Sequence, residues 1–422
     1  MTRDRFGQFG ALAHLFAPAD PDAPRTIADA GSRWAIDSGE LGHHLAIWGS
    51  PPVTPGGAGA AARWALRREW AIARMHVRGV AGLRVQRLHR LWPPRSGGRL
   101  SGLVRAFALG GAICELAAGP SSDRVIDAVL AAAGGAAMST PRIRAGRDGS
   151  VLIRIDMADG PAMLRIAPPH DAGRLESAVD ALRFLRDADV PLVPRLIDRG
   201  ETAGRSWATE TVTPGSPPAR LSSELLSDVA DFAARLTVGR RPITAPRDDL
   251  AAMAVVVPSA SVQLERVAAA VIADLAPLPA VIQHGDLLLS NLLTRRGGLT
   301  GVVDWETWHP AGVPGVDLLQ LTAFDGLGLG GDLGSMWRAR PWQSAAYRSL
   351  SRSYFEALGV EAEDRQLHAI AVAWWANRIN VLRRRPERRR LFEDSAWIEA
   401  NVGVVLRAIC DELGLRTGPV HA

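Results

Sequence analysis

The sequence of 422 residues contains no lysine, and this absence limits the chemistry of its basic side chains. All 49 basic residues are therefore arginines, and the chain has a formal net charge of +5 at pH 7. A guanidinium group stays charged at physiological pH and binds phosphate or carboxylate in a bidentate manner. Any site that would otherwise use a lysine ammonium group must use an arginine here.

Cysteines and long apolar runs are also scarce. The two cysteines, Cys114 and Cys410, lie far apart in the sequence, which excludes a disulfide framework and a cysteine zinc site and is typical of a reducing compartment. No apolar run reaches the roughly 20 uncharged residues that a membrane span needs, and the first residues lack a signal-peptide pattern. We therefore expect a cytoplasmic protein.

Hydrophobic periodicity predicts a small sheet followed by a larger helical part. VLIRIDM (151–157) and AMLRIA (162–167) alternate as two strands joined by the turn ADGP. Apolar residues recur at helical spacing across 175–185, and helices dominate from about residue 221 onward. A chain of this length exceeds one ordinary core, so we expect two or three domains.

The stretch VIQHGDLLLSNLL (281–293) carries the most specific chemistry in the sequence. It places Asp286 five residues before Asn291, on a loop between two apolar runs. A carboxylate can position a hydroxyl group, and an amide oxygen can coordinate a hard cation. GVVDWETW then places Asp304 at the end of another short strand, where a second carboxylate would bind the metal from another direction. This pattern suits phosphoryl transfer around Mg²⁺, in which catalysis is mostly positioning and charge neutralisation.

HGDLLLSN, followed by VVDWE and GVPGVDLL, is similar to the aminoglycoside phosphotransferase and choline kinase family, whose fold resembles that of protein kinases. The resemblance covers residues 140–410 and implies a kinase that transfers the γ-phosphoryl group of ATP to a small-molecule hydroxyl. The acceptor would be an amino alcohol, a sugar or an aminoglycoside-like compound. By this resemblance Asp286 is the catalytic base, His284 braces the catalytic loop, and Asn291 and Asp304 bind Mg²⁺.

The same resemblance implies a nucleotide-binding part. Arg165 in AMLRIA stands where the family places a lysine, and it would pair with Glu176 on the following helix. ATETVTPG (208–215) resembles a hinge around Glu210 to Val212 whose backbone groups bind adenine. Asp317 would anchor the catalytic loop and not touch the substrate.

The predicted fold class is α+β, with a bilobal protein-kinase-like domain preceded by a separate α/β domain. Residues 1–135 would form the N-terminal domain, 136–215 the small nucleotide lobe, and 216–422 the helical lobe with the catalytic loop and the acceptor site. ATP and Mg²⁺ would bind between the two lobes. Because arginine replaces the family's lysine at position 165, an alternative function stays open. The chain would then be a catalytically weak nucleotide-binding or scaffolding module fused to an anion-binding domain, in a polysaccharide or lipid pathway.

Two segments are rich in arginine. Residues 61–100 contain ten Arg and one Glu, hence a local net charge of +9, which favours an anionic ligand or a membrane surface. A solvated charged face is the alternative, and nucleic acid is not expected, because no zinc-finger, helix-turn-helix or RNA-binding signature is present. The second segment, VLRRRPERRRLFEDS (381–395), would contact an acidic or phosphorylated acceptor or simply end a helix.

Overall fold

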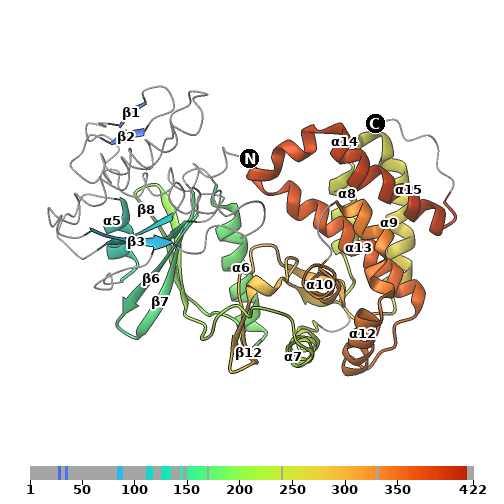
Figure 1. Cartoon of the computed structure of the whole chain (residues 1–422), viewed down its shortest axis with the longest axis horizontal. Helices are drawn as coiled ribbons and strands as arrows, with labels where there is room; N and C mark the ends of the chain where they lie inside the picture. Colours follow the sequence, from blue (N-terminus) through green and yellow to red (C-terminus); the bar gives the residue numbers. More distant parts are fainter. Residues whose placement is uncertain are drawn as a thin grey trace, which may run out of the picture. The chain divides into compact units, whose positions relative to one another are not determined.

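The computed structural model describes residues 125–134, 150–168, 171–238, 241–328 and 332–415, with short strands at 27–29, 34–36, 83–88, 111–116 and 143–145. Contacts divide the chain into two compact units, and Figure 1 shows the elements of both. Unit 1 comprises Met1–Leu175 and Leu196–Val212, and unit 2 comprises Glu176–Arg195 and Thr213–Ala422. The chain therefore passes from unit 1 to unit 2 directly after Val212, in the segment that resembles a hinge.

Unit 1 contains a five-stranded antiparallel sheet with the strand order β5-β6-β7-β9-β8. The strands are β5 (Ile143–Ala145), β6 (Val151–Met157), β7 (Gly160–Ile166), β8 (Leu196–Thr202) and β9 (Arg205–Thr211). In β6 and β7 every second side chain is buried, as alternation predicts for a sheet with one covered face. The predicted hairpin is therefore confirmed.

Helix α5 (Val125–Ala132) follows strand β4 (Gly111–Leu116). It lies within the segment 1–135, yet it packs against β8 and β9 of the five-stranded sheet. This helix is thus part of the same unit as the five-stranded sheet. Most of the rest of the predicted N-terminal domain lies outside the described residues.

Three further short strands belong to that N-terminal segment. They are β1 (Ile27–Asp29), β2 (Trp34–Ile36) and β3 (Leu83–Leu88). The first two pair with each other, and β3 pairs with β4, all antiparallel. The arginine-rich segment 61–100, for which an anionic ligand or membrane surface is expected, lies outside the described residues apart from β3.

Unit 2 is mainly helical, as the sequence predicts from residue 221 onward. Its longer helices are α6 (Gly173–Asp187, of which the first three residues belong to unit 1), α7 (Ser223–Ala234), α8 (Ala245–Met253), α9 (Ser261–Leu275), α12 (Ala345–Ala357), α13 (Asp364–Arg383) and α15 (Val404–Glu412). Helices α8, α9 and α13 pack together, and α15 packs against α9 (Figure 1). Trp374 and Trp375 of α13 are fully buried in this core.

Two small antiparallel sheets of two strands each lie in the same unit. Strand β10 (Val281–Gln283) pairs with β13 (His309–Gly312), and β11 (Leu292–Arg295) pairs with β12 (Gly298–Val302). The short helices α10 (Val316–Leu321), α11 (Leu333–Ala339) and α14 (Ser395–Ile398) complete the unit, with a π-helical turn at Thr322–Gly326 and a 3₁₀ segment at Pro386–Glu393. The loop that contains Asp286 lies between β10 of one sheet and β11 of the other.

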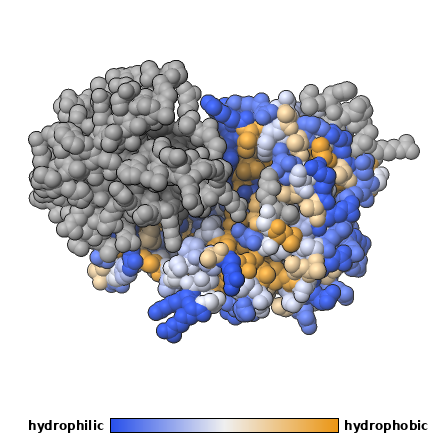
Figure 2. All heavy atoms as spheres, in the orientation of Figure 1, coloured by the Kyte–Doolittle hydropathy of each residue, from blue (hydrophilic) through white to orange (hydrophobic). Residues whose placement is uncertain are grey.

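In the described part of the face shown in Figure 2, hydrophilic residues line the outer edges, and hydrophobic residues gather toward the middle. Among the helices of the described residues, none combines the length and the apolar character that a bilayer crossing requires.

Candidate active site

The loop from His284 to Asn291 begins directly after β10, with a glycine that the backbone requires. Gly285 has a φ of +81°, which is in the left-handed region. A Cβ atom at this position would lie 2.3 Å from the carbonyl oxygen of Thr307. Only glycine therefore fits between His284 and Asp286 without a backbone shift.

Two carboxylates bind the backbone of this loop. Asp317 on α10 accepts hydrogen bonds from the amides of His284 (2.7 Å) and Gly285 (2.9 Å). Asp325 in the π-helical turn accepts one from the amide of Leu289 (2.7 Å). Burial raises the pKa of both carboxyls, although these backbone bonds oppose the shift. Asp317 thus has the contacts expected of a loop anchor, whereas Asp325 was not predicted from the sequence.

His284 connects the loop to the strand that precedes Asp304. Its Nε2 lies 3.0 Å from the carbonyl oxygen of Val303, and its Nδ1 accepts a hydrogen bond from the amide of Asp286 (3.3 Å). Both contacts fit a single neutral tautomer that carries its proton on Nε2. The imidazole also packs on Trp305, with ring centroids 4.6 Å apart. These contacts restrict the position of Asp286 and agree with a bracing role for His284.

Asn291 and Asp304 meet at the open end of the β11–β12 hairpin. Leu292 pairs with Val302 in this hairpin, and the amide of Val303 donates to the carbonyl oxygen of Asn291 (2.9 Å). Asp304 follows directly, half-buried and with a φ of +72° that aspartate tolerates better than most residues. The antiparallel pairing therefore brings together two residues that are thirteen positions apart.

The donor set at this end of the hairpin fits Mg²⁺. The Nδ2 of Asn291 donates to the carbonyl oxygen of Asp286 (2.9 Å), so the amide oxygen points the other way and accepts from the hydroxyl of Ser290 (3.2 Å). No group of three or more His, Cys, Asp or Glu side chains in the described residues is arranged to bind a metal alone. Mg²⁺ commonly uses one or two protein oxygens and takes its other ligands from phosphates and water.

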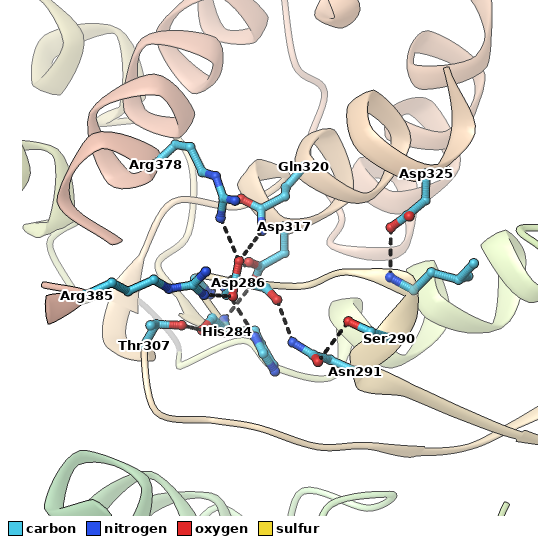
Figure 3. Close-up of polar contacts among 12 residues, drawn as sticks. His284, Asp286, Ser290, Asn291, Thr307, Asp317, Gln320, Asp325, Arg378 and Arg385 are labelled. Carbon is cyan, nitrogen blue, oxygen red and sulfur yellow. Dashed lines mark hydrogen bonds and ion pairs between the residues drawn. The ribbon is translucent and has the colours of Figure 1, made fainter. Parts of the chain in front are cut away.

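The carboxylate of Asp286 is almost buried and has three side-chain donors (Figure 3). Its Oδ1 accepts from Arg378 (2.7 Å) and from Nε2 of Gln320 (3.1 Å), and its Oδ2 forms an ion pair with Arg385. Burial alone would raise the pKa of Asp286, but the guanidinium groups of Arg385 and Arg378 keep it below its ordinary value. Asp286 is therefore ionised at neutral pH, as a base must be.

Gln320, Arg378 and Arg385 were not predicted from the sequence as site residues. A signal existed for Gln320, since it lies three positions after Asp317 on the same face of α10. Arg385 belongs to the arginine-rich segment 381–395, where the sequence predicts contact with an acceptor but no ion pair with Asp286. The two arginines are separated from Asp286 by 92 and 99 residues, and local patterns carry no information on such contacts.

The predicted nucleotide-binding residues are divided between the two units. Arg165 on β7 lies in unit 1, where its Nε donates to the carboxylate of Glu210 on β9 (3.0 Å). Val212 follows β9 in the same unit, whereas Glu176 on α6 lies in unit 2. The contact with Glu210 was not predicted, and the pairing of Arg165 with Glu176 stays a prediction.

Comparison with protein-family models gives one match. Residues 139–370 match the model described as "Phosphotransferase enzyme family". The matched range includes the loop at 284–291 and Asp304. Among curated proteins no significant match is found.

Several solved structures are similar at low sequence identity. An aminoglycoside phosphotransferase from Streptomyces rimosus, in complex with ADP and streptomycin, is 20% identical, with a TM-score of 0.38 over 58% of this chain and 95% of that chain. A macrolide 2′-phosphotransferase from Brachybacterium faecium is 19% identical, with a TM-score of 0.43 over 66% of this chain and 95% of that one.

Proposed function

Because the chain belongs to the phosphotransferase enzyme family, we propose that it transfers the γ-phosphoryl group of ATP to a hydroxyl group of a small molecule. In this proposal Asp286 orients the acceptor hydroxyl and takes its proton. His284 keeps Asp286 in position through the hydrogen bond to its backbone amide. Asn291 and Asp304 bind Mg²⁺, which would neutralise charge on the phosphates when bound.

We assign nucleotide binding to residues of the small lobe, 136–215, and acceptor binding to the helical lobe, 216–422. Arg165 would contact the phosphates, with its guanidinium oriented by Glu210. A guanidinium replaces the ammonium group of a lysine with the same charge and a different reach. Glu176 would assist Arg165, and the backbone from Glu210 to Val212 would bind the adenine ring.

One observation carries the proposal: a hydrogen bond joins Asn291 to the backbone of Asp286, and a backbone bond joins Asn291 to the residue before Asp304. In this proposal the proton acceptor Asp286 and the metal ligand Asn291 share the loop that Asp317 contacts, and the second metal ligand, Asp304, follows strand β12. Phosphoryl transfer depends mainly on such fixed positioning.

The test is the variant Asp286→Asn, assayed by ATP turnover with water as the surrogate acceptor. We expect turnover to fall about 10²- to 10⁴-fold, the usual contribution of a general base. Mg²⁺-dependent nucleotide binding should be retained, because in this proposal Asp286 contacts the acceptor and not the nucleotide. Asp231→Asn, at an exposed position on α7, is the matched control and should behave like the parent.

Two other outcomes would decide against this function. If the parent hydrolyses ATP and Asp286→Asn does so equally well, the loop 284–291 is not the catalytic loop. If the parent binds Mg²⁺·ATP without any turnover, the chain is the nucleotide-binding module of the alternative function.

A further inference from the structure

The carboxylate of Asp286 lies between two guanidinium groups, one on α13 and one just beyond its end. Arg378 is on α13, and Arg385 lies seven residues later, at the junction between α13 and the 3₁₀ segment Pro386–Glu393. Figure 3 shows the two side chains approaching Asp286 from different directions. Both are mainly buried, with 11% and 21% of the side chain exposed. One carboxylate between two guanidinium cations leaves a net positive charge beside the proposed base.

Two polar atoms next to this ion-pair cluster have no partner among the described residues. The Nε of Arg385 is buried without an acceptor, and the Oε1 of Gln320 is buried without a donor. Each belongs to a side chain whose other end contacts Asp286. A buried N–H group without an acceptor is costly, and a ligand with anionic oxygens would satisfy it. A hydroxyl group could donate to the oxygen of Gln320.

The acidic residues near this cluster are already engaged. Asp317 and Asp325 accept from backbone amides of the loop. Asp249 on α8 accepts a hydrogen bond (3.0 Å) from Asn380, which lies two residues after Arg378 on α13. A cationic acceptor would therefore be repelled by the two arginines beside Asp286. To pair with Asp317, Asp325 or Asp249 it would have to replace a hydrogen bond that the carboxylate already accepts.

From this arrangement we infer that the acceptor is anionic: it carries a carboxylate or phosphate group close to the hydroxyl that is phosphorylated, and Arg378 and Arg385 bind that group. This inference rests on the proposed function, since it names the acceptor class of the same site. Both arginines lie beyond residue 370, where the match to the family model ends.

The two arginines have different roles in this inference. Arg378 stacks on the ring of Phe324 at 5.0 Å, and that ring contacts Trp374, so the guanidinium has little freedom to move. Arg385 lies where one helical segment ends and the next begins, and it blocks Oδ2 of Asp286. When an anionic acceptor binds, Arg385 transfers its contact from Asp286 to the acceptor anion, and Oδ2 becomes available to the hydroxyl.

The reaction balances without any further reactant. The acceptor oxygen forms a bond to the γ-phosphorus, and the bond from that phosphorus to the β–γ bridging oxygen breaks. The hydroxyl proton passes to Asp286 and then to solvent, so the products are the phosphorylated acceptor, ADP and one proton.

The first experiment compares four probe acceptors that share a three-carbon hydroxylated scaffold. Glycerate carries a carboxylate and glycerol phosphate carries a phosphate, so these two probes are anionic. Glycerol is neutral, and aminopropanediol carries an ammonium group. In the presence of Mg²⁺, at least one of the anionic probes should stimulate ADP formation more strongly than glycerol and aminopropanediol do. Glycerate and glycerol phosphate distinguish the two kinds of anion. Stimulation that is dependent on Asp286 but favours glycerol or aminopropanediol would overturn the inference and leave the proposed function intact.

The second experiment measures binding and does not depend on turnover. In Asp286→Asn the arginines lose their internal carboxylate, so the better of the two anionic probes should bind about 10-fold more tightly than to the parent, measured by calorimetry with ADP and Mg²⁺ at saturation. Adding Arg385→Gln to this variant should reverse the gain, and Arg385→Lys should retain part of it. Arg389→Gln is the matched control, because this arginine is 85% exposed and pairs with Glu393.

Melting temperatures of all variants show whether each one folds. If neither anionic probe binds to a folded Asp286→Asn variant, or if binding does not depend on Arg385, the inference is wrong. If the parent binds no nucleotide and consumes no ATP with any probe, the proposed function itself is wrong. This result differs from the two results that contradict only the anionic acceptor.

Discussion

Replacing Asp317 by Asn tests whether one buried carboxylate fixes the loop 284–291. The two carboxylate oxygens of Asp317 accept from two successive backbone amides, those of His284 and Gly285. An asparagine can accept one of these bonds with its oxygen, but its NH₂ group faces the other N–H group. One buried amide would then lose its acceptor, at a cost of about 1–3 kcal/mol.

A second effect has the opposite sign. Burial raises the pKa of Asp317, which means that its negative charge is costly in this environment, and the neutral asparagine removes that cost. We therefore expect a net loss of about 2 kcal/mol in the free energy of unfolding. For a unit of this size such a loss corresponds to a decrease in melting temperature of about 4–8 °C.

The assay is urea unfolding of the full chain, with thermal unfolding as a second measurement. Asp325→Asn is the matched control, because Asp325 accepts a single amide and is only half-buried, so that the asparagine oxygen can replace the lost acceptor. Its cost should stay below about 1 kcal/mol. If the two variants lose equal stability, or if Asp317→Asn loses none, the loop does not depend on Asp317 as we argue.

Three further predictions concern other residues. Asp304→Asn should abolish the Mg²⁺ dependence of nucleotide-induced thermal stabilisation, and an unchanged dependence would contradict its role as a metal ligand. Arg165→Ala should weaken nucleotide binding more than Arg165→Lys, because the position needs a cation and because the alanine leaves the buried carboxylate of Glu210 unpaired; equal affinities for ATP would show that Arg165 does not contact the phosphates. Burial raises the pKa of Asp249 to about 6, although a hydrogen bond from Asn380 opposes the shift. Below about pH 4 this group is protonated in both states, and between about pH 4 and 6 only the folded state retains the proton, so stability falls as pH rises through this window, by up to about 3 kcal/mol. Asp249→Asn should therefore raise the melting temperature relative to the parent more at about pH 8 than at about pH 4, and an equal difference at both pH values would refute this.

Residues close in sequence could be predicted well. Alternation identified the hairpin of β6 and β7, because each strand buries one face, and helical spacing identified α6 and α7. The proximity of Asn291 and Asp304 also followed from the sequence, since each lies next to a short apolar strand and the two strands pair.

Contacts between distant segments could not be predicted in the same way. Nothing in the local pattern around Arg378 distinguishes it from another arginine on a helix, and its contact with Asp286 depends on how α13 packs. The pairing of Arg165 with Glu210 was missed for a related reason. A helix glutamate was expected as the partner by resemblance, whereas the register of β7 and β9 places Arg165 opposite Ala208, two residues from Glu210.

The ion pairs of Asp286 also have a consequence for the order in which the chain folds during synthesis. Arg378 and Arg385 leave the ribosome 92 and 99 residues after Asp286, a delay of about 5–20 s at ordinary elongation rates. Closing so long a segment is a late and entropically costly step, so local hairpins and helices form before it. Until α13 packs, the carboxylate of Asp286 has neither of its arginine partners. A nascent chain that ends before Arg378 therefore contains the complete loop 284–291 but not the two cations that surround Asp286 in the finished fold.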